Sequence, residues 1–271
     1  MQYAKLYFKF LNRQAALKRP LRVIFDCSNG PAGLVLKNLK IKNIKATIIN
    51  SRIDGRFPAH GPNPLVKMAT NQCAKEVRSR KADLGAVFDG DADRVMFIDD
   101  LGRRIPVHVI TYLLSLKTPP PYVADLYISR TLTHLNLLKT VDSKVGAYYM
   151  KKTMKRVRAS FGAEFSGHYY FKEMGNADSG VLATIKVANA LSGLPYKISQ
   201  FYDSLPEFYF EQWNIGIKHK ERVEKKIKSK ASKDLFLIVR SSNTEPATRF
   251  FLGSRNKKIF QKELKRLQKI Q

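Results

Sequence analysis

The sequence has few cysteines and no long apolar run. Cys27 and Cys73 are its two cysteines in 271 residues, and their spacing is not that of a metal site. A disulfide framework is therefore not expected, and a reducing compartment fits. No apolar stretch reaches the ~20 residues that a membrane-spanning helix needs, and the first residues lack a small-residue cleavage site. We expect a cytoplasmic chain without a membrane partner.

Acidic residues are also scarce. The chain has 22 Asp and Glu against 49 Lys and Arg, which gives a formal net charge of +27. Such a charge favours anionic partners. Nucleic-acid binders usually gather basic and aromatic residues in a recognisable module, and the sequence shows none, so nucleic acid is an unlikely partner. The plainest explanation is a lysine-rich solvated surface, although sugar phosphates would also be attracted.

The apolar runs predict two successive α/β units. Runs at 21–26, 44–50 and 82–89 indicate strands, with helices after the first run and at about 65–80, so the order is that of a parallel sheet. The pattern then begins again, with expected elements that we give by residue number: a helix at 107–116, a strand at 122–129, a helix at 147–157, an extended region at 161–171 and a helix at 179–193.

The last part changes character. It predicts a lysine-rich helix or strand pair around 223–230, strands at 234–240 and 247–253, and a terminal helix at 258–271. The predicted fold class is therefore α/β, with two consecutive α/β units of mixed, mainly parallel sheets followed by a small α+β C-terminal domain. The expected divisions are a connector helix at 1–18, domains at 19–107 and 108–205, and the α+β domain at 206–271.

Three carboxylates alternate directly after the third predicted strand. Asp89, Asp91 and Asp93 can converge on one hard cation, and Mg²⁺ prefers such oxygen ligands. Arg94 follows and could neutralise a phosphate. An EF-hand would need Gly and Glu where Arg94 and Asp100 stand. A solvated acidic turn is the plain alternative, which so basic a chain disfavours.

A second loop carries Glu164, Ser166 and His168 at alternate positions. In an extended loop these side chains point to one side and offer an acceptor, a hydroxyl and a switchable donor to sugar hydroxyls. A histidine by itself would more often be structural. A serine-hydrolase elbow is excluded because Glu and His stand where Gly-x-Ser-x-Gly requires glycine.

A third loop lies between the last two predicted strands. Arg240, Ser242, Asn243 and Thr244 form a compact set of donors that suits a phosphate. A capped turn between two strands is the alternative, and from this loop alone it is slightly favoured.

Taken together, the three loops resemble those of the α-D-phosphohexomutases, the family of phosphoglucomutases and phosphomannomutases. Residues 89–94 resemble its metal-binding loop, 164–168 with 177–180 its sugar-binding loop, and 240–246 its phosphate-binding loop. Weaker similarities lie at 26–33 and 57–64. All of them occur in the family's order, which makes chance similarity improbable.

The resemblance implies a function and its residues. Hexose phosphates would be interconverted between the 1-phosphate and the 6-phosphate, with Mg²⁺ held by Asp89, Asp91 and Asp93. Arg94 and His168 would be the catalytic side chains. The remaining roles follow the loops, with sugar binding by Glu164, Ser166 and His168, and phosphate binding by Arg240, Ser242, Asn243 and Thr244.

The sequence also departs from the family. The family's phosphoserine loop, T-A-S-H-N-P, does not occur, and Tyr127, Ala147 and Gly253 stand where many relatives carry lysine, histidine and glutamate. We therefore expect a mutase that is incomplete alone, with a separately encoded phosphoserine domain as a partner or an upstream part missing from the gene model. The alternatives are a non-catalytic binder of sugar phosphate or Mg²⁺ and, less favoured, a basic nucleic-acid-binding protein.

Overall fold

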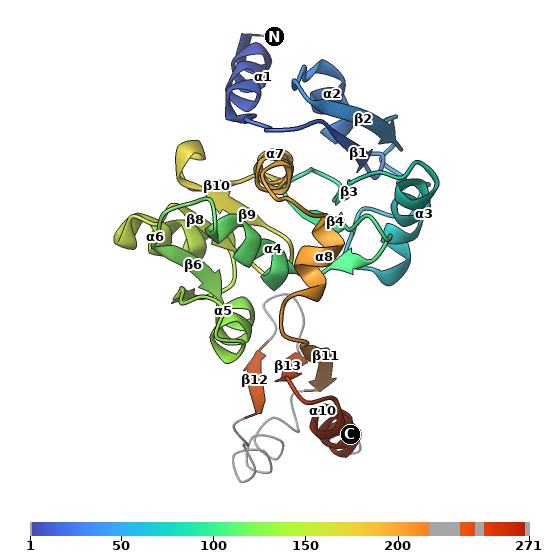
Figure 1. The fold of residues 1–271 in the computed structure, drawn as a ribbon. Coiled ribbons are helices and arrows are strands. Elements are labelled where there is room, and N and C mark those ends of the chain that lie inside the picture. Colours follow the sequence, from blue (N-terminus) through green and yellow to red (C-terminus); the bar gives the residue numbers. More distant parts are fainter. Residues whose placement is uncertain (1, 217–233, 242–246, 269–271) are drawn as a thin grey trace. The chain divides into compact units, whose positions relative to one another are not determined.

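The computed structural model describes residues 2–216, 234–241 and 247–268 (Figure 1). Contacts divide the chain into two compact units. The first contains residues 1–129 and 139–204, and the second contains 130–138 and 205–271. Each unit is considered by itself.

The first sheet belongs to the first unit and has the strand order β2-β1-β3-β4-β5. Strand β1 pairs in parallel with β2 and β3, whereas the β3–β4 and β4–β5 pairs are antiparallel. The strands are β1 (Leu21–Asp26), β2 (Ile44–Ile49), β3 (Leu84–Phe88), β4 (Val95–Ile98) and β5 (Arg104–Ile105). The helices of this part are α1 (Gln2–Gln14), α2 (Ala32–Asn38), η1 (Lys67–Thr70), α3 (Asn71–Ser79) and α4 (Val107–Ser115).

The second sheet has the strand order β10-β9-β8-β6-β7. The β6–β7 and β6–β8 pairs are parallel, and the β8–β9 and β9–β10 pairs are antiparallel. The strands are β6 (Tyr122–Asp125), β7 (Val141–Ser143), β8 (Phe161–Ala163), β9 (Tyr169–Phe171) and β10 (Ala177–Asp178). The helices are α5 (Leu126–His134), α6 (Ala147–Val157), η2 (Lys172–Met174), α7 (Gly180–Ser192) and α8 (Ile198–Asp203).

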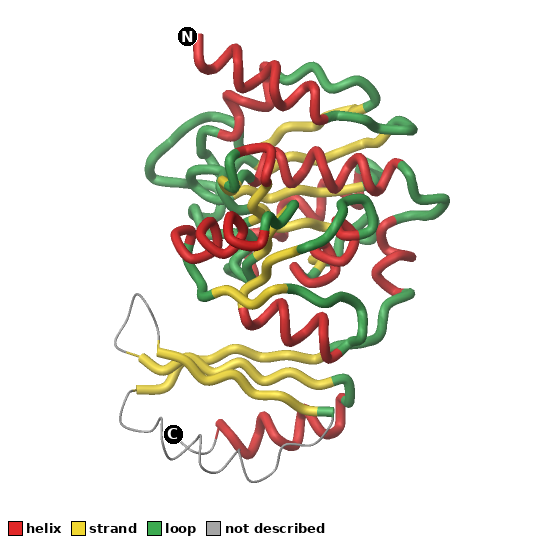
Figure 2. The backbone as a smooth tube through the Cα atoms, turned by 90° about the vertical axis from the view of Figure 1, so that its left-hand side faces the viewer, coloured by secondary structure: helices red, strands yellow, loops and turns green. Residues whose placement is uncertain are grey.

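The two sheets repeat one topology. Read from the second strand of each, the order is β2-β1-β3-β4-β5 in one and β7-β6-β8-β9-β10 in the other, with the same parallel and antiparallel pairings. Helices α2 and α3 of the first sheet correspond in chain order to α5 and α6 of the second, and α4 corresponds to α7. Helices lie alongside the strands in both repeats (Figure 2).

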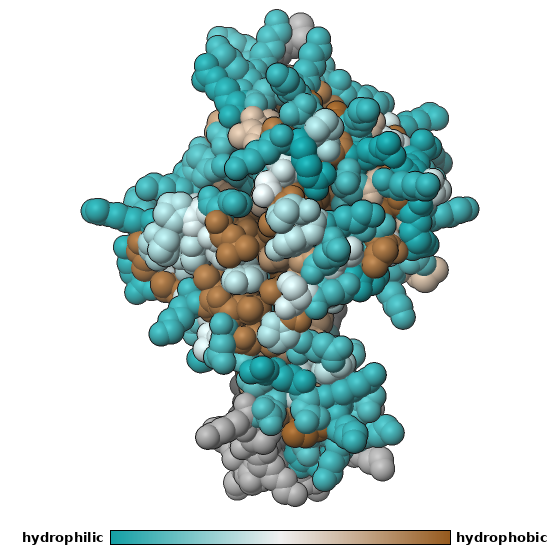
Figure 3. All heavy atoms as spheres, in the orientation of Figure 1, coloured by the Kyte–Doolittle hydropathy of each residue, from teal (hydrophilic) through white to brown (hydrophobic). Residues whose placement is uncertain are grey.

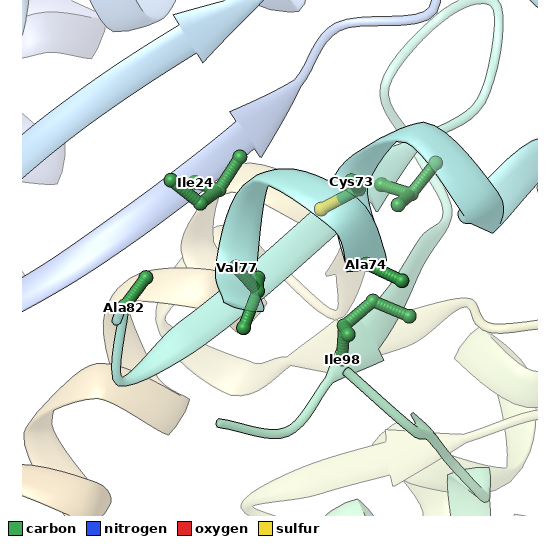
Figure 4. Close-up of a cluster of buried hydrophobic side chains, with 7 residues drawn as sticks. Ile24, Cys73, Ala74, Val77, Ala82 and Ile98 are labelled. Atoms are coloured by element: carbon green, nitrogen blue, oxygen red, sulfur yellow. The ribbon is translucent and has the colours of Figure 1, made fainter. Parts of the chain in front are cut away.

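Equivalent helices build the apolar cores. Helix α3 packs Cys73 and Val77 against Ile24, Val87 and Ile98 of the first sheet (Figure 4). Helix α6 covers the second sheet in the same way, with Met150 and Met154 against Val123 of β6 and Tyr170 of β9. These side chains are fully buried or nearly so, and their burial is the main force that holds each sheet to its helix.

The second unit has a sheet of order β11-β13-β12, in which both pairings are antiparallel. Its elements are β11 (Tyr209–Gly216), β12 (Leu235–Ser241), β13 (Ala247–Ser254) and α10 (Lys257–Gln268). Phe250 and Leu252 of β13 pack against Phe260 and Leu267 of α10, so this unit has a core of its own.

The predicted fold class is confirmed, with mixed sheets and a small α+β part at the end. One element is wrong, because the strand expected at 122–129 ends at Asp125 and α5 begins at Leu126. Asp125 explains the change, since its Oδ1 accepts a hydrogen bond from the Ile128 N–H (2.9 Å) and so satisfies the start of a helix. The helix expected at 65–80 is a 3₁₀ turn followed by α3. The elements expected around 223–230 lie outside the described residues.

Hydrophilic atoms cover most of the surface that Figure 3 shows. Lys and Arg are rarely buried without a partner, so a chain with 49 of them exposes mainly polar side chains. Of the helices that the structure describes, none combines the length and the apolar character that crossing a membrane demands.

Candidate active site

The acidic loop follows the carboxyl end of β3, where ligands of such sheets usually bind. One carboxylate oxygen from each of Asp89, Asp91 and Asp93 lies within 4.8 Å of the others. Asp89 is buried, Asp91 is exposed and Asp93 is intermediate, so the cluster opens to solvent on one side. The residues that were predicted to hold a metal ion are thus brought together, and they form an acidic cluster of the kind that can hold one.

Arg94 lies against the same cluster. Its backbone N–H donates to Asp89 Oδ1 (3.0 Å), its Nε lies 2.5 Å from Asp89 Oδ2, and the same Nε lies 3.8 Å from Asp93 Oδ1. Burial raises the pKa of Asp89, and the adjacent Asp93 carboxylate raises it further. Two carboxylates so close together are more stable with a cation between them, which is why a divalent ion fits this donor set.

The predicted sugar loop follows β8, the strand equivalent to β3. Ser166 Oγ and His168 Nδ1 lie 2.8 Å apart, which orients the imidazole. Glu164 is almost completely buried; its Oε1 accepts from the Gly146 N–H (2.6 Å) and its Oε2 from the Tyr170 hydroxyl (2.7 Å). Burial raises the pKa of Tyr170, and the Glu164 carboxylate adds to the effect. The buried Glu164 carboxylate therefore stabilises the loop through hydrogen bonds to residues on either side of it in the sequence.

The predicted metal loop (residues 89–94) and the predicted sugar loop (residues 164–168), called the metal loop and the sugar loop below, are in contact. His168 Nε2 lies 3.3 Å from Asp93 Oδ2, and Arg94 and His168 form an antiparallel backbone bridge. The Val95 N–H also donates to the Gly167 carbonyl (3.1 Å). Residues 75 positions apart in the chain thus meet because each loop occupies the same place in its own repeat, between the third and fourth strands of its sheet.

Close backbone approaches hold this junction. The Gly180 N–H donates to the Ala92 carbonyl (3.1 Å), and a Cβ on Gly180 would lie 2.8 Å from the Arg94 oxygen. Gly167 has a φ of +92°, and a Cβ there would meet the Met96 side chain at 2.6 Å. Glycine at these two positions lets the start of α7 and the sugar loop reach the metal loop.

Asp178 belongs to the 177–180 segment that resembles the family's sugar-binding loop, although no individual role was predicted for it. A carboxylate oxygen of Asp178 lies within 4.8 Å of ligand atoms of Asp93 and His168, and Lys151 Nζ lies 3.7 Å from Asp178 Oδ1. Besides that resemblance, Asp178 is an acidic residue in a strongly basic chain, immediately before the capping residue of α7.

Only part of the predicted phosphate loop is described. Arg240 lies near the end of β12, in register with Arg249 of β13. Ser242, Asn243 and Thr244 lie outside the described residues, so their role stays a prediction.

The three departures from the family have structural counterparts. Tyr127 is buried and its ring packs on Phe165, with centroids 5.7 Å apart. Ala147 is the first residue of α6. A Cβ on Gly253 would lie 2.5 Å from the Phe208 ring and 2.8 Å from that of Phe236, so a glutamate could not replace this glycine without displacing both rings.

Comparisons with known proteins agree with this geometry. Residues 3–102 match the family model of phosphoglucomutase/phosphomannomutase α/β/α domain II, and residues 117–209 match that of domain III. The phosphomannomutase of Methanocaldococcus jannaschii is 27% identical over 96% of this chain and 63% of its own length. The phosphomannomutase/phosphoglucomutase of Pseudomonas syringae is 31% identical over 74% of this chain and 45% of its own length. The chain thus spans less than two thirds of either relative.

Solved structures show the same fold. A phosphoglucomutase/phosphomannomutase family protein of Burkholderia thailandensis superposes with a TM-score of 0.82 at 21% identity, over 97% of this chain and 63% of that one. An N-acetylphosphoglucosamine mutase of Aspergillus fumigatus, solved with GlcNAc-6P and magnesium, superposes with a TM-score of 0.67 at 15% identity, over 98% of this chain and 68% of that one. From the two matched domains, the relatives and the fold, this chain belongs to the α-D-phosphohexomutase family.

Proposed function

We propose that this chain supplies the metal-binding and sugar-binding part of a phosphohexomutase, which interconverts hexose 1-phosphates and 6-phosphates. The observation that carries the proposal is the junction of the two loops, with His168 Nε2 3.3 Å from Asp93 Oδ2. This short distance between a residue predicted to bind sugar and a residue predicted to bind the metal ion supports the proposal. Bound substrate would then present its reacting oxygen to both loops.

Asp89, Asp91 and Asp93 would hold Mg²⁺. The donor set is all oxygen and open on one side, as this ion prefers, and the A. fumigatus relative was solved with magnesium and a sugar phosphate. When bound, Mg²⁺ would withdraw charge from the transferring phosphoryl group.

The chain's own side chains would position the substrate. Arg94 holds Asp89 in place and brings a guanidinium to the same edge, where it offsets phosphate charge. Ser166 orients His168 through Nδ1, so that Nε2 can exchange a hydrogen bond or a proton with a sugar hydroxyl. Arg240 with Ser242, Asn243 and Thr244 would bind the phosphate that does not react.

The phosphoryl donor would come from another domain. The family's phosphoserine loop does not occur in these 271 residues, so we propose that activity requires a phosphoserine domain as a partner in the cytoplasm. The buried Tyr127 and the Ala147 start of α6 favour a second candidate function, a non-catalytic binder of hexose phosphates. General acids and bases contribute ~10² to 10⁴-fold each, so their loss would cripple turnover more than binding.

Isothermal titration with glucose 1-phosphate and mannose 1-phosphate, with and without Mg²⁺, tests the binding site. We expect Asp91→Asn to weaken Mg²⁺-dependent binding by about tenfold or more, because it removes one exposed ligand charge. Glu211→Gln, an exposed carboxylate of β11, is the control with the same change in charge. Absence of saturable binding by the wild type at millimolar ligand would contradict the proposed site.

A reconstitution assay separates the two candidate functions. The phosphoserine domain of a relative is added as a separate polypeptide, and formation of glucose 6-phosphate from glucose 1-phosphate is followed. Turnover that disappears in Asp91→Asn supports the mutase. Binding without any turnover in the presence of that domain supports the non-catalytic binder.

A further inference from the structure

A cavity of about 710 Å³ lies in the first unit, apart from the candidate active site. Its walls come from the segment after α1, the end of α4, the loop before β6, η2 and α7. None of its lining residues belongs to the metal or sugar loop. They include Lys18, Lys117, Lys172 and Lys186 together with the apolar Leu114 and Ala190.

The lining is strongly basic. It contains four lysines and one carboxylate. The carboxylate already forms an ion pair with one of these lysines, because Glu173 Oε1 lies 2.6 Å from Lys186 Nζ. Lys18, Lys117 and Lys172 form no ion pair with any residue that the structure describes. Three lysines from three separate segments therefore line one hollow, and none of them has an ion-pair partner among the described residues. Such a surface attracts an anion that carries more than one charge.

Hydrogen bonds fix the wall that carries Lys18. Asn189 of α7 accepts from the Ala16 N–H (2.8 Å) and donates to the Gln14 carbonyl (2.7 Å). The Lys18 N–H donates to Ser192 Oγ (2.9 Å), and Lys186 Nζ donates to Gln14 Oε1 (2.9 Å). The connecting segment is thereby tied to α7 along its length, so the cavity is formed before any ligand arrives.

The cavity also has an apolar part. Leu114 and Ala190 are buried side chains in its lining, and Pro119 and Gly193 add further apolar surface. Ligand pockets commonly measure ~300 to 1,000 Å³ and combine apolar walls with a few convergent polar groups. A ligand that fits therefore has a phosphorylated end and a less polar body.

We propose that this cavity is a second ligand site, which binds a small metabolite carrying two or more phosphate charges. Lys18, Lys117 and Lys172 contact the phosphates, and the surface around Leu114 and Ala190 contacts the rest. The site does not depend on the proposed mutase activity, because it shares no residue with the metal and sugar loops.

Isothermal titration with inorganic pyrophosphate and with adenosine triphosphate, in EDTA to exclude metal effects, tests the proposal. The pocket variant is Lys18→Ala with Lys117→Ala and Lys172→Ala. The matched control is Lys45→Ala with Lys75→Ala and Lys262→Ala, exposed lysines outside the cavity that give the same change in net charge. Lys117→Glu alone is a second pocket variant, and because Lys117 is exposed we expect it to fold normally.

We expect the wild type and the control to bind both probes, and the pocket variant to bind at least tenfold more weakly, since each lost charged hydrogen bond costs about that factor. Equal weakening in the pocket and control variants would overturn the proposal in favour of diffuse surface attraction. So would absence of wild-type binding at millimolar probe. A further titration uses duplex DNA with the wild type, the triple pocket variant and the triple control variant. If DNA affinity follows net charge alone, and pyrophosphate binds the three proteins equally, the basic surface is a nucleic-acid-binding surface and the proposal is wrong.

Discussion

At the residue scale, glycines decide whether the two active-site loops can meet. Gly180 begins α7 and contacts the backbone of the metal loop, where a methyl group would lie 2.8 Å from the Arg94 oxygen and 3.0 Å from that of Ala92. Neither oxygen belongs to a flexible side chain, so the loop itself would have to move. The position of the proposed metal ligands therefore depends on a glycine that has no functional side chain.

Gly180→Ala is expected to lower the free energy of unfolding by ~1 to 3 kcal/mol, because it forces a backbone shift in a packed region. It should also weaken metal binding, since the shift moves the loop that carries Asp91 and Asp93. Denaturant unfolding and metal titration measure the two effects. Gly55→Ala is the control, because a Cβ there meets nothing within 4 Å. An unchanged free energy of unfolding in Gly180→Ala would show that residues 92–94 can move away from the added methyl group without loss of stability.

A second residue-scale feature is the pair of His60 and Asp26. His60 Nε2 lies 3.2 Å from Asp26 Oδ2, and Asp26 is completely buried at the end of β1. The interaction with Asp26 raises the pKa of His60 above its ordinary value, in spite of partial burial. Protonation of His60 is therefore favoured by the folded state.

The sign of the pH effect follows from this direction. Because the folded pKa lies above the unfolded value of about 6.5, the stabilisation is complete below about pH 6.5 and is lost as the pH rises through the folded pKa. His60→Gln should therefore cost more stability at about pH 5.5 than at about pH 9, in urea unfolding at both values. A cost independent of pH would mean that the pair does not form in solution.

At the element scale, the repeated topology explains how one site is built from two halves. Loops after β3 and β8 occupy the same place in their sheets, and one supplies carboxylates whereas the other supplies the imidazole. Helix α7 joins the halves, since it follows β10 of the second sheet and contacts β3 and β4 of the first. Its first turn lies at the junction, so the cap of α7 contributes to the site.

Ser179→Ala is expected to lower the free energy of unfolding by ~1 kcal/mol. The Ser179 hydroxyl accepts from the Leu182 N–H (3.1 Å), and without it that buried donor loses its partner. Thermal unfolding measures the change. Ser79→Ala is the comparison, because that exposed hydroxyl donates to a carbonyl within α3 and caps no helix start. Equal effects in the two variants would contradict a capping role.

At the scale of the whole molecule, the chain consists of two units with separate cores. Phe250 and Leu252 pack against Phe260 and Leu267 of α10 within the second unit. Ile24, Val87 and Ile98 hold α3 to the first sheet. Since each core is buried within its own unit, a substitution that leaves a cavity in one core should lower the stability mainly of that unit.

Phe250→Ala should therefore destabilise the second unit by ~3 to 5 kcal/mol, the usual cost of a fully buried phenylalanine. Hydrogen exchange followed by mass spectrometry should show faster exchange in 205–216, 234–241 and 247–268, and little change in β1 or β3. Lys262→Ala, exposed on α10, is the control. Faster exchange throughout the chain would show that the two units unfold together.

Much of the fold could be predicted from local pattern. The strands at 21–26 and 44–49 and the helix at 147–157 follow directly from apolar periodicity and turn residues. Strands β4, β5 and β11 were not predicted, because β4 and β5 are short and β11, although eight residues long, has a mixed sequence. The boundary at Asp125 was missed because a capping carboxylate changes strand into helix within an apolar run.

Residue types along the chain already specify the available chemistry: three alternating carboxylates, an imidazole beside a serine, and a large excess of lysine. Folding, by contrast, brings His168 to Asp93, adds Asp178 to the pair and gathers four lysines around one cavity. The difference arises because residue type is local, whereas contact between distant loops depends on strand order and on backbone approaches such as that at Gly180. Pattern along the chain specifies each half of the site, and packing of the two repeats brings the halves together.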